Sequence, residues 1–136
     1  FNIVPKIALL SYSNFGSSPG EDADKMSKAV QLLHDNHPNI IVDGEVQANF
    51  ALDSELMNDK FSFSQLANKQ VNTLIFANLS SGNISYKLFQ QMTDGDAIGP
   101  ILIGLNKSIH VMQLGASVRE INNMVKIAAI QSQNKK

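Results

Sequence analysis

The residues best suited to chemistry in this sequence stand in short polar segments that follow apolar runs. The first segment is residues 11–18, SYSNFGSS, which offers hydroxyls, backbone amides and a flexible glycine directly before an expected helix. Such a segment suits a phosphate or another anion. Its candidate ligands are Ser11, Ser13, Gly16 and Ser17. The alternative is an ordinary strand-to-helix turn with capping serines, because the spacing matches neither a P-loop nor a dinucleotide-binding fingerprint.

A pair of carboxylates, Asp43 and Glu45, flanks Gly44 at the end of a second apolar run. Strand alternation places both acids on one face at the carboxyl end of the strand. Two carboxylates in this position can orient a basic group, bind a cation or form an ion pair with a lysine. The alternative is a bend in which the acids bind neighbouring backbone amides.

A third candidate is the segment Gly82-Asn83-Ile84-Ser85-Tyr86-Lys87. Gly82 and Asn83 are expected to open a helix and to expose its first amides. Tyr86 and Lys87 then reach an anionic ligand from the first turns. Alternatively, Asn83 caps the helix, Tyr86 packs and Lys87 is a solvated charge.

A fourth candidate is the turn Gln113-Leu114-Gly115, which also leads from an expected strand into a helix. The turn offers amides and one carboxamide, with Gly115 as its candidate ligand. Its tip carries neither a nucleophile nor a cation. Glu120 stands three residues after Ser117, a spacing that predicts a capping box rather than a catalytic acid.

The three histidines do not indicate a metal site or a catalytic triad. His34 and His37 fall at the end of an expected helix, without a third ligand at a suitable spacing. His110 falls within an expected strand, where a packed or hydrogen-bonded role is predicted. No Ser-His-acid arrangement is defensible from the spacing.

The elements that must position these residues alternate between strands and helices. Short apolar runs predict buried strands, and apolar stripes at three-to-four-residue spacing predict helices. Ser18, Pro19 and Glu21 predict the start of the first helix. The expected strands are residues 6–12, 39–46, 73–77, 100–105 and 109–114, and the expected helices are residues 18–36, 47–57, 84–92 and 117–133, with a break at Asp94-Gly95-Asp96. This order predicts an α/β fold with a mostly parallel sheet covered on both faces.

Composition limits the possible functions. The 136 residues suffice for one domain, and 43% of them are hydrophobic. Eleven Lys and Arg against 12 Asp and Glu argue against a nucleic acid or an anionic membrane as the partner. Cysteine is absent, which excludes disulfides and thiolate chemistry, and no apolar run has the length of a membrane span. We therefore expect a soluble cytoplasmic protein. Because the chain starts with Phe1 and a strand follows almost at once, we also expect a piece of a longer protein.

Four segments in this order resemble the C-terminal half of the phosphate acetyl/butyryl transferase family. They are LLSYSNFGS, VDGEVQ, ANLSSGNISYK and GPILIGLNKSI. The resemblance implies a three-layer α/β/α architecture like that of isocitrate and isopropylmalate dehydrogenases, with coenzyme A bound between two domains and a homodimer or larger homo-oligomer. Residues 1–136 would form the C-terminal part of such a domain, and residues 117–136 would be a helix that returns to the neighbouring domain.

The departures from this family are informative. Active phosphotransacetylases carry Ser-Arg-Gly where this chain has Gln113-Leu114-Gly115, and an aspartate where it has Glu120. Losing the arginine removes a bidentate donor for an acyl-phosphate. The altered turn resembles that of multimodular NADP-dependent malic enzymes, whose C-terminal region looks like a phosphotransacetylase.

The resemblance to malic enzymes implies a non-catalytic regulatory and oligomerisation domain with acetyl-CoA as its effector. The full-length protein would catalyse the oxidative decarboxylation of malate to pyruvate. NADP and Mg²⁺ or Mn²⁺ would bind in its N-terminal region, outside these 136 residues. The alternative is an active phosphate acetyltransferase, which moves an acetyl group between coenzyme A and phosphate and takes its arginine from the neighbouring domain.

Overall fold

A computed structural model describes residues 3–93 and 97–133 of the chain. It contains two compact units, which adjoin in the sequence at Ser85 and Tyr86. The expected helix break at Asp94-Gly95-Asp96 lies outside the described residues, as do residues 134–136 of the expected C-terminal segment.

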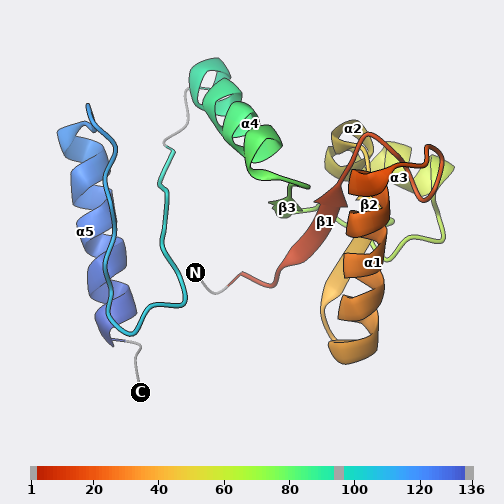
Figure 1. The fold of residues 1–136 in the computed structure, drawn as a ribbon, viewed down its shortest axis with the longest axis horizontal. Helices are drawn as coiled ribbons and strands as arrows, with labels where there is room; N and C mark the ends of the chain where they lie inside the picture. The colour runs from red at the N-terminus through yellow and green to blue at the C-terminus, as the bar shows by residue number, and fades with distance from the viewer. Residues whose placement is uncertain (1–2, 94–96, 134–136) are drawn as a thin grey trace. The chain divides into compact units, whose positions relative to one another are not determined.

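The first unit contains a parallel three-stranded sheet, which confirms the α/β prediction (Figure 1). Its central strand is β1 (Lys6–Leu10), with β2 (Ile41–Val46) on one side and β3 (Thr73–Ile75) on the other. All three strands are shorter than predicted. Strand β1 ends at Leu10 because the chain turns away after the Ser11 amide has bonded to the Val46 carbonyl at 3.0 Å.

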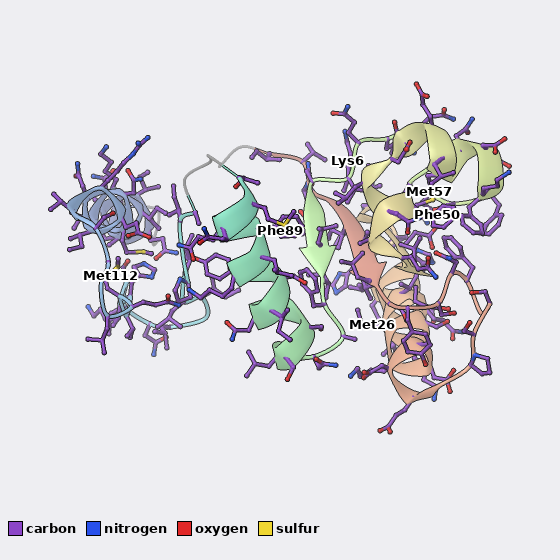
Figure 2. The ribbon with its side chains drawn as sticks, turned by 90° about the horizontal axis from the view of Figure 1, so that it is seen from above. Lys6, Met26, Phe50, Met57, Phe89 and Met112 are labelled. Atoms are coloured by element: carbon purple, nitrogen blue, oxygen red, sulfur yellow. The ribbon has the colours of Figure 1, made fainter. Side chains whose placement is uncertain are left out.

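Side chains of β1 alternate between two hydrophobic clusters, as the pleat of a strand requires. Ala8 and Leu10 belong to one cluster, whose largest fully buried members are Met57 and Leu66. Leu9 belongs to the other cluster, which Met26, Val30 and Val42 complete. Met57 therefore extends from helix α3 (Ser54–Lys60) into one cluster and Met26 from helix α1 (Glu21–Asn36) into the other (Figure 2). The sheet is covered on both faces, as predicted.

Helix α1 (Glu21–Asn36) starts later than predicted. Pro19 is not its first residue, and no side chain caps it. The reason is the preceding loop, because the Ser18 amide donates to the Ser13 hydroxyl at 3.0 Å instead of belonging to the helix. The acidic first turn still complements the helix dipole. The predicted apolar stripe is confirmed in Ala23, Met26 and Val30, which are buried.

The helix predicted over residues 47–57 is divided into α2 (Ala48–Leu52) and α3 (Ser54–Lys60). Asp53 separates them in an extended conformation. Its Oδ1 accepts hydrogen bonds from the amides of Glu55 (3.1 Å) and Leu56 (2.9 Å) and so caps α3.

Helix α4 (Leu79–Met92) begins at Leu79, so the prediction that Gly82 and Asn83 open it is wrong. Asn78 precedes the helix, and its Oδ1 accepts from the Ser81 amide at 2.9 Å. The Gly82 amide donates to the Asn78 carbonyl at 3.2 Å and is therefore used within the helix.

The second unit contains α5 (Val118–Gln133), whose inner face includes the buried Met124 and Ile127. Residues 100–105 and 109–114 are not strands, contrary to the prediction, because within residues 97–117 no backbone ladder forms. Their polar contacts go to side chains instead. The Leu102 amide donates to His110 Nδ1 at 3.3 Å, and His110 Nε2 lies 2.8 Å from Gln131 Oε1. Residues 109–114 run beside α5 (Figure 1). None of the helices in the described ranges is long and apolar enough to cross a membrane.

Candidate functional site

The loop after β1 is held from within by a buried network. Ser13 is completely buried, and its hydroxyl donates to Glu45 Oε1 at 2.8 Å. The Gly16 amide donates to the same oxygen at 2.6 Å. Gly16 has a φ of +84°, which favours glycine at this turn. Two of the predicted anion ligands, Ser13 and Gly16, therefore bind Glu45.

The other two predicted ligands of this loop also make contacts inside it. The Ser17 hydroxyl accepts from the Asn14 amide at 2.9 Å, and the Ser11 hydroxyl accepts from the Ser13 amide at 3.2 Å. Ser11 differs from the rest because it lies at the wall of a cavity, together with the half-exposed Tyr12.

Asp43 and Glu45 bind different segments. Asp43 Oδ2 accepts from the Ser64 hydroxyl at 2.7 Å and from the Gln65 amide at 2.8 Å, whereas Glu45 holds the loop after β1. The strand register shifts between them, since Leu9 pairs with Gly44 and Leu10 pairs with Val46. Both acids thus bind amides and hydroxyls of segments distant in the sequence, and Asp43 Oδ1 also accepts from the adjacent Gly44 amide at 2.9 Å.

The first unit contains a cavity of about 330 Å³ beyond the carboxyl ends of β1 and β3. This is the position at which α/β sheets usually bind ligands. Hydroxyl and amide groups mix with apolar groups in its lining. The lining residues are Leu10, Ser11, Tyr12, Asp22, Ala48, Phe76, Ala77, Asn78, Ser81 and Ser85.

Asp22 supplies a carboxylate to this cavity. Its Oδ1 accepts from Lys25 Nζ at 2.7 Å, and its Oδ2 accepts from the side-chain Nδ2 of Asn78 at 3.1 Å. The hydrogen bond from Lys25 is the main cause that lowers the pKa of Asp22 below its usual 3.8. Asp22 therefore remains charged at neutral pH, and Lys25 balances its charge.

A second pocket, of about 260 Å³, lies within the second unit. It brings together residues from the third and fourth candidate segments. The lining residues are Tyr86, Lys87, Gln90, Gly99, Met112, Gln113, Leu114, Gly115, Ala116 and Glu120.

Lys87 is the cation among these lining residues. Its Nζ donates to Gln113 Oε1 at 2.8 Å and to Gln90 Oε1 at 3.3 Å, and lies 4.9 Å from the centroid of the Tyr86 ring. All three partners are neutral, so the positive charge of the ammonium is not cancelled by them. Leu114 is fully exposed at the tip of the turn and offers no polar group.

Glu120 forms the predicted capping box with Ser117. The Ser117 amide and hydroxyl donate to Glu120 Oε2 at 2.7 and 2.8 Å, and the Glu120 amide donates back to the Ser117 hydroxyl at 3.2 Å. The bonds from the Ser117 amide and hydroxyl, with a smaller effect of Lys87, lower the pKa of Glu120 below its usual 4.5. Glu120 is therefore an ionised carboxylate that stabilises the start of α5.

The described residues contain no group of three His, Asp or Glu side chains that could hold a metal ion. His34 Nε2 lies 2.8 Å from the Val42 carbonyl oxygen, and His110 bridges Leu102 and Gln131 as described above. Both histidines therefore have structural hydrogen-bond partners.

Sequence reasoning missed Asn78 and Ser81 as lining residues of the first cavity, whereas Ser85 belongs to the third candidate segment. The signal was present, because asparagine is one of the residues preferred at the N-cap of a helix. The capping geometry at Asn78 places Ser81 and Ser85 one turn apart on α4.

Comparison with known proteins identifies related sequences over nearly the whole chain. The family model described as "Phosphate acetyl/butaryl transferase" matches residues 1–129. An NADP-dependent malic enzyme from Haemophilus influenzae is 41% identical over 133 residues, which are 98% of this chain and 18% of the relative. A phosphate acetyltransferase from Clostridium acetobutylicum is 41% identical over 132 residues, which are 97% of this chain and 39% of the relative.

A similar fold is found in a solved phosphotransacetylase from Streptococcus pyogenes, with a TM-score of 0.89 and 39% identity. The match covers 98% of this chain and 40% of that structure. The chain thus spans well under half the length of these relatives. The same type of domain occurs in malic enzymes and in phosphate acetyltransferases.

Proposed function

This chain belongs to the phosphate acetyl/butyryl transferase family, and on that premise we propose that it is a non-catalytic, acetyl-CoA-binding domain of an NADP-dependent malic enzyme. In this proposal the domain regulates the enzyme and joins its subunits into a homodimer or larger homo-oligomer. Similarity to malic enzymes from several bacteria over at least 98% of this chain supports it.

The observation that carries the non-catalytic role is the turn at Gln113-Leu114-Gly115. Transfer of an acetyl group to or from phosphate needs positive charge and hydrogen-bond donors where negative charge develops. This turn instead presents a fully exposed leucine, and the side-chain oxygen of Gln113 is already bonded to Lys87. The turn itself therefore contributes no cation to the reaction.

Two features support binding of acetyl-CoA without turnover. The hydrogen-bond partners of Lys87 are neutral, and the nearby Glu120 carboxylate is bonded to Ser117, so the ammonium group can interact with a phosphate or another anionic group of the ligand. The cavity of the first unit combines apolar walls with hydroxyls and amides, which suits a long, partly polar thioester chain. Each unit thus offers chemistry that coenzyme A esters require.

Regulation would follow if acetyl-CoA binds one quaternary arrangement of the enzyme more tightly than another. In this proposal the N-terminal region of the same chain binds NADP and a divalent metal and decarboxylates malate oxidatively to pyruvate. The partners are acetyl-CoA, further copies of the chain and the N-terminal region.

The deciding experiment is malate-dependent reduction of NADP by the full-length protein, with and without acetyl-CoA. A rate that changes with acetyl-CoA supports a regulatory domain. A rate that acetyl-CoA leaves unchanged, with no binding heat in calorimetry, contradicts acetyl-CoA regulation and leaves a structural role.

The second candidate function is active phosphate acetyltransfer. Phosphate acetyltransferases from Helicobacter pylori and Clostridium acetobutylicum are as similar to this chain as the malic enzymes are, at 42% and 41% identity. Gln113 and main-chain amides would then stabilise the acyl-phosphate, with an arginine from another domain. Release of coenzyme A from acetyl-CoA and phosphate by the full-length protein would establish this function, and its absence at high enzyme concentration would reject it.

A further inference from the structure

Glu45 is a buried carboxylate that has no ion-pair partner in the described part of the chain. Its residue is only 2% exposed, and both ion pairs found there involve other acids. Burial of a carboxylate costs free energy unless hydrogen bonds to the charged form compensate for lost water. The Ser13 hydroxyl and the Gly16 amide supply two such bonds, both to Oε1.

Residues 45–47 make four further hydrogen bonds to the same loop. These bonds are distributed over residues 11–15 of the loop. The contacts are Phe15 N to Glu45 O (2.8 Å), Ser11 N to Val46 O (3.0 Å), Gln47 N to Asn14 Oδ1 (2.8 Å) and Gln47 Nε2 to Tyr12 O (2.7 Å).

The fastened loop forms one wall of the cavity in the first unit. Ser11 and Tyr12 line this cavity, but Ser13 is completely buried beneath them. Glu45 therefore acts on the wall through Ser13 and Gly16, and it is not among the lining residues.

We infer that Glu45 is a positioning residue, which fixes residues 11–17 so that Ser11 and Tyr12 form a ready-made wall of the acyl-CoA cavity. The inference rests on the proposed function, because that function supplies the ligand. A wall that is ordered before binding improves affinity, since no loop entropy is lost when the ligand arrives.

A second buried acid on the same strand, Asp43, provides a control for the role of Glu45. Asp43 lies two residues before Glu45, is also buried, and accepts a hydrogen bond of 2.7 Å from the buried Ser64. The Ser13–Glu45 and Ser64–Asp43 pairs are therefore chemically alike. They differ in that, among the described residues, Ser64 makes no hydrogen bond to the loop after β1, which its segment meets through the rings of Phe61 and Phe63 against Phe15.

The test compares Glu45→Gln and Ser13→Ala with Ser64→Ala in the full-length protein. Calorimetry should give a Kd for acetyl-CoA that rises about five- to tenfold in the first two variants, because each weakens a charge-assisted bond. The Kd of Ser64→Ala should stay within about twofold of the wild type, because Ser64 makes no hydrogen bond to the loop of residues 11–17. Hydrogen exchange at the Phe15 and Gly16 amides should accelerate in Glu45→Gln and remain slow in Ser64→Ala.

Each outcome bears on a different claim. Absence of acetyl-CoA binding by the wild type rejects the proposed function, and the exchange data then decide alone whether Glu45 fixes the loop. Unchanged exchange at Phe15 and Gly16 in Glu45→Gln overturns the inference, as does an equal loss of affinity in Ser64→Ala. If Glu45→Gln does not fold, Ser13→Ala carries the same comparison, with exchange read at the Gly16 amide, whose acceptor on Glu45 this variant retains.

Discussion

The Nζ atom of Lys87 lies 2.8 Å from Oε1 of Gln113, which stands 26 residues later in the chain. This bond joins α4 to the turn that precedes α5. A neutral carboxamide orients an ammonium group without cancelling its charge. Lys87 is therefore both a structural tie within the second unit and a cation that can meet an anionic ligand.

Replacement of Lys87 by alanine should weaken the response of the full-length protein to acetyl-CoA. Loss of a hydrogen bond to a charged group predicts a rise of about tenfold in the half-maximal concentration. The measurement is a titration of malate-dependent NADP reduction with acetyl-CoA. Lys126→Ala is the control, because Lys126 is exposed on α5 and lines neither of the two pockets. An unchanged response in Lys87→Ala would remove this lysine from the ligand site.

The double variant Gln113→Ser with Leu114→Arg should increase the release of coenzyme A from acetyl-CoA and phosphate. The two changes restore the Ser-Arg-Gly turn that active relatives are expected to carry. One added donor for developing negative charge can raise a rate about 10²-fold. The single variant Gln113→Ser should show little gain, since it adds no positive charge. If the double variant stays at background, the altered turn is not what limits acyl transfer.

Glu120 should titrate below the usual value of 4.5 in the folded chain. Hydrogen bonds from Ser117 stabilise its ionised form, so its pKa is lower in the folded state than in the unfolded state. Its contribution to stability is therefore complete above the unfolded pKa and is lost as the pH falls through the folded pKa. Carboxyl NMR of the chain gives the titration midpoint, and urea unfolding at several pH values gives the stability. Glu120→Gln should show a smaller loss of stability on acidification, and a midpoint at or above 4.5 would contradict the capping box.

Met57 should contribute far more to stability than Met92. Met57 is 1% exposed in the cluster that also contains Leu66, whereas Met92 is 79% exposed at the end of α4. Met57→Ala should lower the free energy of unfolding by about 2–5 kcal/mol, because it leaves a cavity. Met92→Ala should change it by no more than about 0.5 kcal/mol. Urea denaturation of both variants tests this. Similar losses of unfolding free energy would mean that the cluster around Met57 and Leu66 is not a packed core.

Strands β1 and β3 were predictable because their apolar runs are continuous and short, and β2 because Ile40, Ile41 and Val42 precede its polar end. Such runs occur where both faces of a parallel sheet are buried, as β1 is between its two clusters. The capping box at Ser117 and Glu120 was predictable for a different reason. Its partners are three residues apart, so no distant part of the chain is needed to form it.

The start of α4 was not predictable from propensity alone. Gly82 and Asn83 favour a boundary, yet the cap at Asn78 starts the helix earlier. Residues 100–105 also misled, because an apolar run becomes a strand only where another backbone pairs with it. The pocket around Lys87 and Gln113 could not be predicted without knowing the path of the chain, because the two residues come from distant segments.

The central strand of the sheet is the one that comes first in the chain, and this fixes the order in which the first unit can be completed. β1 has one partner only once residues 41–46 are present, and the other only once residues 73–75 are present. Asn72 finishes the second pairing, since its Oδ1 accepts from the Lys6 amide at 2.8 Å and its Nδ2 donates to the Val4 carbonyl at 2.9 Å. A nascent chain that ends before Asn72 leaves one edge of β1 without its hydrogen bonds. During synthesis that edge is open to other strands, and it closes when β3 leaves the ribosome.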